Sequence, residues 1–242
     1  MPRYSVCIAT YNGEKYIKQQ ISSILSQLGD NDEIIVSDDS SSDNTLVLIE
    51  ELADPRIRIY AGQQFRNPIY NFEFCLSKAK GEIIFLSDQD DVWLPGKVDR
   101  IVETFRYYKC DVVVSDAVIV DERLNTLHES FLGSISGGPG MLKNICKNTY
   151  LGCTMAMQRG ILDKVLPFPK KIPMHDMWIG LIGELFGKTI FIKYKLILYR
   201  RHSNTVTTNK HSNIINMIKW RINLIVSLIL RYIKILMGNN YK

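Results

Sequence analysis

The sequence predicts an α/β fold: a mostly parallel central sheet with flanking helices, followed by a C-terminal amphipathic helix. Three observations lead to this prediction. Short runs of β-branched residues alternate with helical patterns, which is typical of strands joined by crossover helices. Polar residues follow several of these runs, at the strand ends where open parallel sheets bind ligands. The last segment is broadly apolar, with polar residues at helical spacing.

The regular elements follow one another closely in the first half of the chain. Strands are expected at 4–10, 32–38, 57–62, 82–87 and 111–120. Helices are expected at 14–28, 43–52, 71–80 and 96–105. In the first helix Ile17 and Ile21 fall on one face, which would pack against the sheet. A Gly/Ser/Pro-rich loop at 133–140 then separates a nucleotide-binding half (1–122) from a later half (141–210).

The composition fits one domain with an extension. Of the 242 residues, 46% are hydrophobic, which is enough to bury a core. The net charge of +5 is too small to indicate nucleic acid as a partner. Five scattered cysteines without a CxxC pair fit a reducing compartment. Because a strand begins almost at once, with no signal peptide before it, we expect the globular part to be cytoplasmic.

The segment 214–237 consists mostly of Ile, Leu, Met and Val, and predicts an amphipathic, basic helix within a C-terminal unit at 211–242. Its narrow polar stripe comprises Asn216, Lys219, Asn223, Ser227, Arg231 and Lys234. No charge-free run approaches the ~20 residues of a membrane span. Two interpretations stay open. The helix lies in a membrane interface, with residues such as Arg221 and Arg231 near anionic headgroups, or it packs on the domain's own surface.

Carboxylates crowd the end of the fourth predicted strand. In "EIIFLSDQDDVW" (82–93), Asp88, Asp90 and Asp91 lie within four positions and would repel one another. In an extended chain Asp88 and Asp90 face the same way. Such a pair suits Mg²⁺ or Mn²⁺, which prefer oxygen ligands and commonly also bind substrate phosphates.

The acidic residues allow three other interpretations. "DSSSDNTLVLIE" (39–50) resembles a calcium loop but has Asn44 where the loop requires glycine, so we reject it. "IIFLSDQDDV" loosely resembles the nucleophile motif of haloacid-dehalogenase-like phosphotransferases, but the later acidic motif of that superfamily would then come first in the chain. Aspartates that only cap helices would explain part of the role of Asp43 but not the DQDD cluster.

Several motifs in order resemble one family. "VCIATYNGEKYI", "EIIVSDDSSSDNT" and "FLSDQDDVWLPGKV" together resemble the family 2 glycosyltransferases, which are inverting enzymes of the GT-A fold. The variant DQDDVW looks most like the bacterial rhamnosyltransferase-type members that build surface polysaccharides. "MHDMWIGLIGELFGKTIFI" (174–192) and "LYRRHSNTVT" (198–207) agree with this resemblance. It covers residues 4–207 and implies a GT-A domain at 1–210 with a Rossmann-like first half.

The resemblance also implies roles for single residues. Along the nucleotide it places Thr10, Tyr11, Asn12, Asp38, Asp39, Asp43 and Asp88. It makes Asp90 the more direct ligand of Mn²⁺ or Mg²⁺, with Asp88 assisting, and it brings His202 near the diphosphate or the metal. Asp176 matches the position of the catalytic base.

The surroundings of Asp176 allow a second interpretation. Because it stands at the predicted start of a helix, it could be only an N-cap. The same position would lower its pKa, so that it stays ionised and able to take a proton from the acceptor hydroxyl. In favour of catalysis, its segment follows the loop-rich second half, where we expect the acceptor, and the ring of Trp178 offers an apolar face to a sugar. We expect Trp178 and His175 to bind the acceptor.

The implied function is a hexosyltransferase that adds one sugar per encounter, since the QxxRW motif of processive synthases is absent. The donor would be dTDP-rhamnose or a UDP-hexose. The acceptor would be a lipid-linked oligosaccharide of a growing surface polysaccharide, such as O-antigen, lipopolysaccharide or capsule. The enzyme would then lie peripherally on the inner face of the cytoplasmic membrane. The alternatives are a haloacid-dehalogenase-like phosphotransferase and a non-catalytic protein that binds nucleotide sugars.

Overall fold

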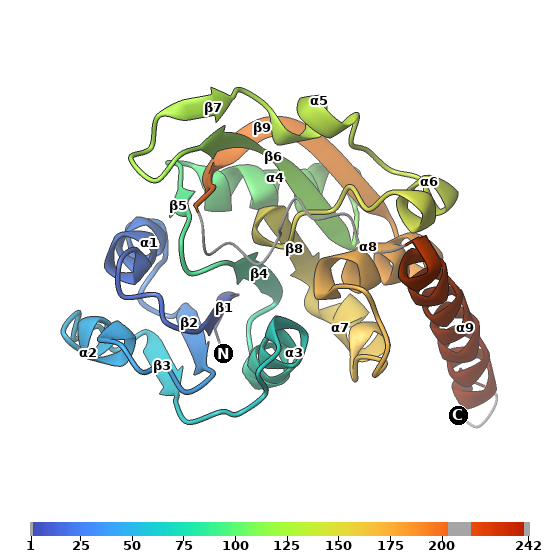
Figure 1. Cartoon of the computed structure of the whole chain (residues 1–242), viewed down its shortest axis with the longest axis horizontal. Helices are drawn as coiled ribbons and strands as arrows, with labels where there is room; N and C mark the ends of the chain where they lie inside the picture. The colour runs from blue at the N-terminus through green and yellow to red at the C-terminus, as the bar shows by residue number, and fades with distance from the viewer. Residues whose placement is uncertain (1, 203–213, 240–242) are drawn as a thin grey trace.

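The computed structural model describes residues 2–202 and 214–239 and contains one curled, mixed sheet with helices on both faces (Figure 1). The sheet has nine strands in the order β3-β2-β1-β4-β8-β6-β9-β5, with β7 paired to β6. Its first part is parallel: β1 lies between β2 and β4, and β2 also pairs with β3. The predicted α/β fold with a Rossmann-like first half and a C-terminal helix is confirmed.

The first half supplies the parallel strands and their crossover helices. These are β1 (Tyr4–Thr10), α1 (Ile17–Leu25), β2 (Glu33–Asp38), α2 (Thr45–Glu50), β3 (Ile57–Tyr60), α3 (Pro68–Lys78) and β4 (Ile83–Ser87). The short β5 (Val92–Trp93), α4 (Lys97–Tyr108) and the long β6 (Val112–Val120) follow. The buried strands read as continuous apolar runs because helices cover both of their faces.

The later half closes the sheet with strands that the sequence analysis did not predict. Its elements are β7 (Thr126–His128), α5 (Phe131–Ile135), α6 (Met141–Cys146), β8 (Met155–Gln158), α7 (Arg159–Val165), α8 (His175–Phe186), β9 (Thr189–Arg200) and α9 (Ile214–Asn239). The strand β8 lies antiparallel between β4 and β6, and β9 runs parallel to β6 and antiparallel to β5. This arrangement brings the end of β9 beside the segment that follows β4.

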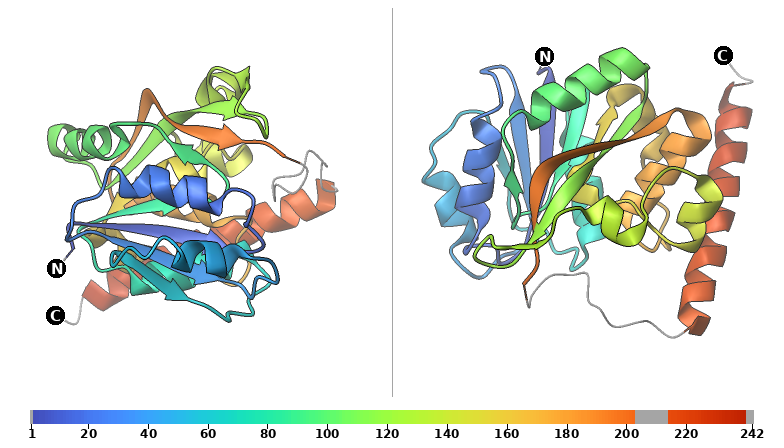
Figure 2. Two further views of the ribbon diagram at one scale, coloured as in Figure 1. Left: turned by 90° about the vertical axis from the view of Figure 1, so that its left-hand side faces the viewer. Right: turned by 90° about the horizontal axis from the view of Figure 1, so that it is seen from above.

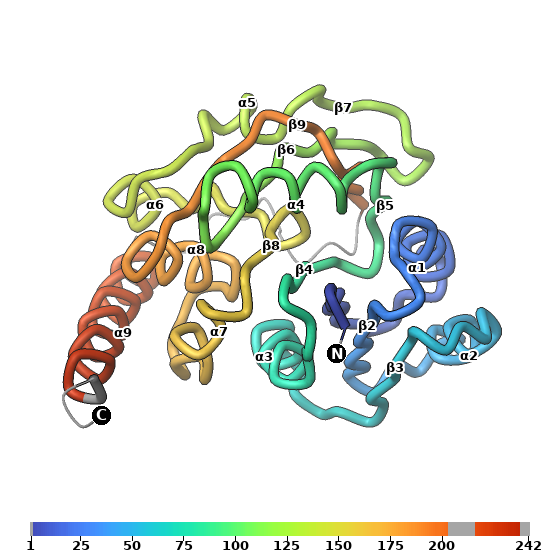
Figure 3. Tube along the Cα trace, turned by 180° about the vertical axis from the view of Figure 1, so that it is seen from behind, coloured from blue at the N-terminus to red at the C-terminus, as the bar shows by residue number. Residues whose placement is uncertain are grey.

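Two hydrophobic clusters occupy the two faces of the sheet. The helices α1, α2 and α4 bury their apolar residues in one cluster, and α3, α7, α8 and α9 bury theirs in the other. Figure 2 shows these layers edge-on, and Figure 3 shows α4 from behind, across the part of the sheet built by β6 and β9. Both faces are therefore closed, and the carboxyl ends of β1, β2 and β4 are left to carry polar groups.

The helix α9 packs along the edge of the molecule, where its residues Leu224 and Leu228 are buried in the second cluster (Figure 1). Arg231 donates to the backbone carbonyls of Leu166 and Lys164, and Arg221 donates to the carbonyl of Cys146. The expectation that Arg221 and Arg231 face lipid headgroups is therefore wrong, because both guanidinium groups dock the helix onto its own domain.

Most of the apolar surface of α9 nevertheless stays exposed. The exposed apolar residues are Ile218, Trp220, Ile222, Ile225, Val226, Ile229, Leu230, Tyr232, Ile233, Leu236 and Met237. Among the described residues, none of the helices combines the length and hydrophobicity that crossing a bilayer demands. The unit boundary expected near residue 210 lies outside the described residues.

The contact between α8 and the preceding segment depends on a glycine. The ring of Tyr150 lies against Gly180 so closely that a Cβ atom there would be 2.4 Å from two ring carbons. The hydroxyl of Tyr150 donates to Glu184 one turn further along the helix, at 2.6 Å. Since Tyr150 is only 2% exposed, its ring has little room to move aside.

We therefore expect Gly180→Ala to lower the free energy of unfolding by about 1–3 kcal/mol through overpacking. The control is Gly160→Ala in α7, where the added Cβ would meet nothing within 4 Å. That substitution should instead raise the free energy of unfolding by up to ~1 kcal/mol, because alanine favours helix more than glycine. Chemical denaturation measures both, and equal stability of Gly180→Ala and the parent would contradict this packing.

Candidate functional site

The acidic segment after β4 is the centre of the site. Asp88 and Asp90 are half-buried, whereas Asp91 is fully buried. Gln20 of α1 holds the start of the segment by donating to the hydroxyl of Ser87 at 2.6 Å and to the carbonyl of Asp88 at 3.0 Å. The crowded carboxylates therefore sit on a fixed backbone at the carboxyl end of a parallel strand.

Arg200, at the end of β9, fixes the rest of this segment. Its backbone N–H donates to Oδ1 of Asp91 at 2.9 Å, and its Nε donates to the carbonyl of Asp90 at 2.7 Å. The other two guanidinium nitrogens donate to the carbonyl of Glu122 and to the side chain of Gln19. The guanidinium group also lies over the ring of Tyr16, 4.4 Å from its centroid. This side chain joins β9, α1 and the turn after β6 to the acidic segment.

His202, two residues further on, contacts Asp90 directly. Its Nε2 lies 2.7 Å from Oδ2 of Asp90, and its ring packs on that of Tyr16 at 5.1 Å between centroids. The two predicted metal ligands, separated by 112 residues in the chain, therefore share one corner of the site. A carboxylate oxygen and an imidazole nitrogen in this arrangement, beside half-buried Asp88, form a donor set that fits a divalent cation.

A buried inner cluster lies behind this corner. Ligand atoms of Asp88, Asp91 and Cys153 lie within 4.8 Å of one another. Burial raises the pKa of Asp88 to about 7, and the negative charges of Asp90 and Asp176 add to the effect. Burial likewise raises the pKa of Asp91 well above its ordinary value. A cation bound here would relieve this mutual repulsion.

A buried lysine supplies positive charge next to the inner cluster. Lys97 is fully buried, and its Nζ donates to the carbonyl of Cys153 at 2.8 Å and lies 4.4 Å from the centroid of the Trp93 ring. Burial lowers the pKa of Lys97 to about 8, while the nearby carboxylates of Asp91 and Asp88 act in the opposite direction. The ammonium group thus partly offsets the acidic charge from inside the protein.

The loops after β1 and β2 use most of their predicted nucleotide-binding acids for their own structure. Asp38 is fully buried and accepts from the hydroxyl of Thr10 at 2.8 Å and from that of Ser41 at 2.6 Å. Asp39 accepts from the backbone N–H of Phe65 at 2.6 Å.

Two further predicted residues, Asn12 and Asp43, tie these loops together. Asn12 accepts from the backbone N–H of Ser42, and Asp43 accepts from the backbone N–H groups of Glu14 and Thr45. The hydroxyl of Thr45, which also donates to Asp43, and these N–H groups hold the pKa of Asp43 below its ordinary value despite partial burial. Thr10, Asn12, Asp38, Asp39 and Asp43 therefore lie at the carboxyl ends of β1 and β2, where their hydrogen bonds shape the loops.

Tyr11 is the predicted residue that faces outward, with 58% of its surface exposed. Gln89 of the acidic segment fixes its backbone: the amide of Gln89 accepts from the N–H of Tyr11 at 2.9 Å and donates to its carbonyl at 3.0 Å. The adjacent Gly13 leaves room for Gln89, since a Cβ there would lie 2.5 Å from the amide oxygen. The exposed ring therefore has a defined place beside the acidic segment.

Asp176 lies in the first turn of α8 rather than at the N-cap, which is Met174. Its Oδ1 accepts from Nδ2 of Asn148 at 3.2 Å and from the N–H of Met177 at 2.5 Å. Burial nevertheless raises the pKa of Asp176 to about 6, against the lowering that these donors and the N–H of Gly152 produce. The expected lowered pKa is therefore wrong, because desolvation outweighs the hydrogen bonds and the helix dipole.

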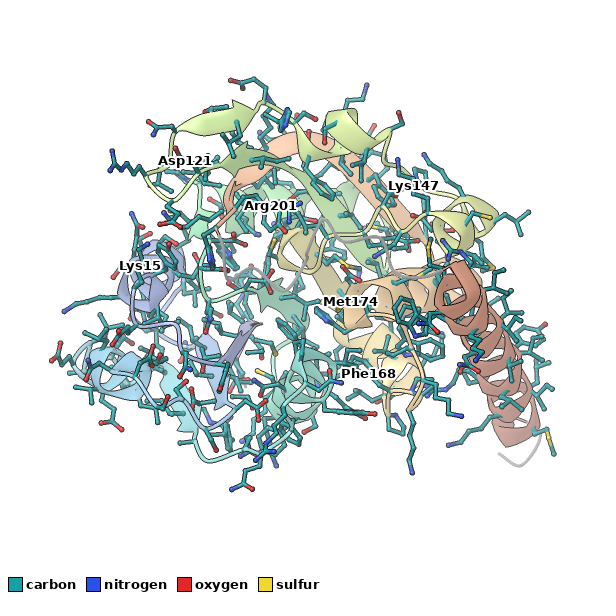
Figure 4. The ribbon with its side chains drawn as sticks, in the orientation of Figure 1. Lys15, Asp121, Lys147, Phe168, Met174 and Arg201 are labelled. Carbon is teal, nitrogen blue, oxygen red and sulfur yellow. The ribbon has the colours of Figure 1, made fainter. Side chains whose placement is uncertain are left out.

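The two predicted acceptor-binding residues beside Asp176 are both buried. Trp178 is fully buried, and its Nε1 donates to the carbonyl of Val165 at 2.9 Å. Because it offers no ring face to an acceptor sugar, the prediction that Trp178 binds the acceptor is wrong. His175 stacks on Phe72 at 4.2 Å between centroids, and burial lowers its pKa to about 3. In Figure 4, the neighbouring Met174 is drawn in the middle of the face seen in Figure 1, with Arg201 above it.

Sequence reasoning missed Gln20, Gln89, Lys97, Asn148 and Arg200. Gln89, Lys97 and Arg200 stand inside the quoted motifs, as the glutamine of "DQDD", the lysine of "WLPGKV" and the first arginine of "YRRH". Their place in a motif could have singled out these three residues, since a motif residue that is not a ligand commonly positions one. No pattern in the sequence distinguishes Asn148.

Comparison with known proteins identifies the fold and the relatives. The family model described as glycosyl transferase family 2 matches residues 5–166. The glucosyltransferase WfgD of Escherichia coli, named for transfer from UDP-Glc to α-D-GlcNAc-diphosphoundecaprenol, is 25% identical over 85% of this chain and 80% of its own. The dTDP-rhamnosyl transferase RfbG of Shigella flexneri is 27% identical over 81% of this chain and 72% of its own.

Solved structures show the same fold. TarS of S. aureus in complex with UDP-GlcNAc superimposes with a TM-score of 0.70 at 19% identity, over 88% of this chain and 62% of the TarS chain. A mannosyltransferase of Pyrobaculum calidifontis in complex with GDP-Man and Mn²⁺ gives a TM-score of 0.62 at 18% identity, over 84% of this chain and 58% of its own. The predicted GT-A type fold is thereby confirmed.

The relatives extend beyond the part that this chain matches. The chain spans 65% of the length of an uncharacterized glycosyltransferase of Nostoc, to which it is 29% identical over 83% of its own residues. Taken together, these similarities favour the glycosyltransferase prediction over the haloacid-dehalogenase-like alternative. They do not confirm the rhamnosyltransferase-like subgroup.

Proposed function

The chain belongs to glycosyl transferase family 2, and from this premise we propose that it moves one sugar, with inversion, from a nucleoside-diphosphate sugar to a hydroxyl of a lipid-linked oligosaccharide. The donor is dTDP-rhamnose or a UDP-hexose, and the product is a surface polysaccharide such as O-antigen, lipopolysaccharide or capsule. The two donor classes are those in the names of its relatives, a dTDP-rhamnosyl group for RfbG and UDP-Glc for WfgD. The name of WfgD also contains a lipid-linked acceptor, which supports the acceptor class proposed here.

One observation carries this proposal: Asp90 and His202 meet at 2.7 Å beside Asp88, at the carboxyl end of β4. These three residues would hold Mn²⁺ or Mg²⁺, with Asp90 as the most direct ligand. Such an ion acts as a Lewis acid that stabilises the charge of the departing diphosphate. Tyr11, with its exposed ring, and the loops shaped by Thr10, Asn12, Asp38, Asp39 and Asp43 would hold the nucleotide.

Asp176 is proposed as the general base. Its negative charge contributes to the raised pKa of Asp88, so the two carboxylates lie within electrostatic range of each other. A donor bound at Asp88 would thus have Asp176 near its sugar. The acceptor hydroxyl is a poor nucleophile, and a carboxylate that takes its proton allows one displacement from the face opposite the diphosphate. His175, the residue before this base, is buried against Phe72, so no contact with the acceptor sugar is proposed for it.

The exposed face of α9 supports the proposed location on the inner face of the cytoplasmic membrane. A contiguous apolar helix face in water is unfavourable, whereas a bilayer interface buries it. Lys219 and Lys234 are exposed on the same helix and suit anionic headgroups. Only Leu224, Leu228 and the residues around them hold α9 on the domain, so its exposed apolar face is left to contact a membrane.

Replacing Asp90 tests the metal-linked donor site. In the parent, UDP or dTDP should raise the melting temperature more with Mn²⁺ than without it. Asp90→Asn should keep the fold and lose the part of this shift that depends on Mn²⁺, because an amide is a weaker ligand for a hard cation. The control is Asp163→Asn, which removes an exposed carboxylate on α7. Unchanged Mn²⁺-dependent binding in Asp90→Asn would refute the ligand assignment.

Replacing Asp176 tests the base. Since the pKa of Asp176 is raised to about 6, the carboxyl is protonated below that pH, and transfer should rise as the pH increases through about 6. Asp176→Asn should fold and bind the donor, but its rate of transfer should fall by ~10²–10⁴-fold. The rise of the transfer rate with pH near 6, which is the acidic limb of the pH profile, should also disappear. Near-parental turnover in the folded variant would exclude Asp176 as the base. If the parent binds nucleotide sugar but transfers to no acceptor, the non-catalytic alternative holds.

Replacing apolar residues on the exposed face of α9 tests the membrane contact without disturbing the docking stripe. The triple variant Ile222→Gln, Ile229→Gln, Ile233→Gln should lose flotation with vesicles that contain anionic phospholipids, while the parent floats. A matched control replaces three exposed apolar residues elsewhere, Val47, Tyr107 and Leu127, and should float like the parent. Equal flotation of the α9 variant and the parent would show that this face does not contact lipid.

A further inference from the structure

Asn148 lies in the segment between α6 and β8, where its side-chain amide donates one hydrogen bond and accepts another. Its Nδ2 donates to Oδ1 of Asp176 at 3.2 Å, and its own Oδ1 accepts from the backbone N–H of Tyr150 at 3.1 Å. The second bond fixes the orientation of the amide, because the oxygen must face Tyr150. The amide nitrogen is thereby directed at the carboxylate that we propose as the base.

The segment that carries Asn148 is locked on both sides. The fully buried side chain of Asn144 donates to the carbonyls of Gly138 and Gly140, and it accepts from the backbone and the hydroxyl of Thr149. A further lock comes from Glu184 of α8, which accepts from the hydroxyl of Tyr150 at 2.6 Å and from the N–H of Gly140 at 3.0 Å. Asn148 is therefore held from both neighbours in the chain and does not owe its place to Asp176.

We propose that Asn148 is a positioning residue for sugar transfer: it holds the Asp176 carboxylate, through one hydrogen bond to Oδ1, in the orientation that accepts the proton of the acceptor hydroxyl. This inference rests on the proposed function of Asp176. The bond is a charge-assisted one that only the ionised carboxylate accepts fully, so it favours the form of Asp176 that can act as a base.

The groups around Asp176 make this donor important. Asp88 faces it from the end of β4 with a like charge, and Tyr150 is kept neutral because burial and the bond to Glu184 raise its pKa. His175, on the same helix, is also neutral because burial lowers its pKa to about 3. None of these three supplies positive charge to the carboxylate. The hydrogen bonds that stabilise the ionised form of Asp176 therefore come from the N–H of Met177, the amide of Asn148 and the N–H of Gly152.

Two variants separate the effect of the hydrogen-bond donor of Asn148 from the effect of the size and shape of its side chain. Asn148→Asp keeps an oxygen that can accept from Tyr150 but replaces the donor with a second carboxylate. Asn148→Leu removes donor and acceptor. We expect the acidic limb of the transfer profile to move up by roughly one pH unit in Asn148→Leu and by more in Asn148→Asp. Turnover near neutral pH should fall about tenfold, with the KM for the donor unchanged.

A double-mutant cycle distinguishes positioning from a structural role. In the Asp176→Asn background, adding Asn148→Leu should cost little further turnover, because the carboxylate on which Asn148 acts is already gone. Losses that multiply in the double variant, or a parental acidic limb in folded Asn148→Asp, would overturn the inference. If Asp176→Asn itself retains full turnover, the proposed base fails first. An inactive Asp176→Asn beside a fully active Asn148→Leu overturns only the role of Asn148.

Discussion

The site depends on one buried arginine. Three neighbouring carboxylates at a strand end repel one another and would splay apart unless the backbone that carries them were fixed. Arg200 fixes it from the opposite strand, through its own N–H to Asp91 and its guanidinium group to the carbonyl of Asp90. The same group packs on Tyr16, against which His202 also lies. Asp90 and His202 are therefore close together because Arg200 holds the backbone of Asp90 and packs on Tyr16, the ring on which His202 also packs.

The acids of this protein divide into two classes by their partners. Asp38 and Asp43 are surrounded by N–H and O–H donors, and the donors keep the pKa of Asp43 low, so these carboxylates build loops. At Asp88 and Asp176 desolvation outweighs the hydrogen bonds that each carboxylate accepts, and their pKa values are raised to about 7 and about 6. Perturbed carboxylates that face each other are typical of sites that bind cations or move protons.

Much of the fold could be predicted from sequence because local patterns determine it. Apolar runs followed by polar residues define the parallel strands, and topology then gathers their ends, so the place of Asp88 and Asp90 followed from the chain alone. Longer-range features could not be predicted. The pairing of β9 with β5 and β6 places Arg200 beside the acidic segment, and no local pattern in the sequence predicts this pairing. The burial of Trp178 and the raised pKa of Asp176 depend on α7, α9 and the segment of Asn148, which meet α8 only in the folded protein.

The position of β9 in the chain has a consequence for biosynthesis. The parallel half is complete once β4 has been made, but Arg200 is the last residue of β9 and His202 follows it by two residues. A nascent chain therefore exposes its acidic segment without the two residues that organise it. A chain truncated before Arg200 would therefore carry the carboxylates but lack the two residues that contact them from the end of the sheet. Premature termination within β9 would leave the acidic segment without the hydrogen bonds from Arg200 that fix its backbone.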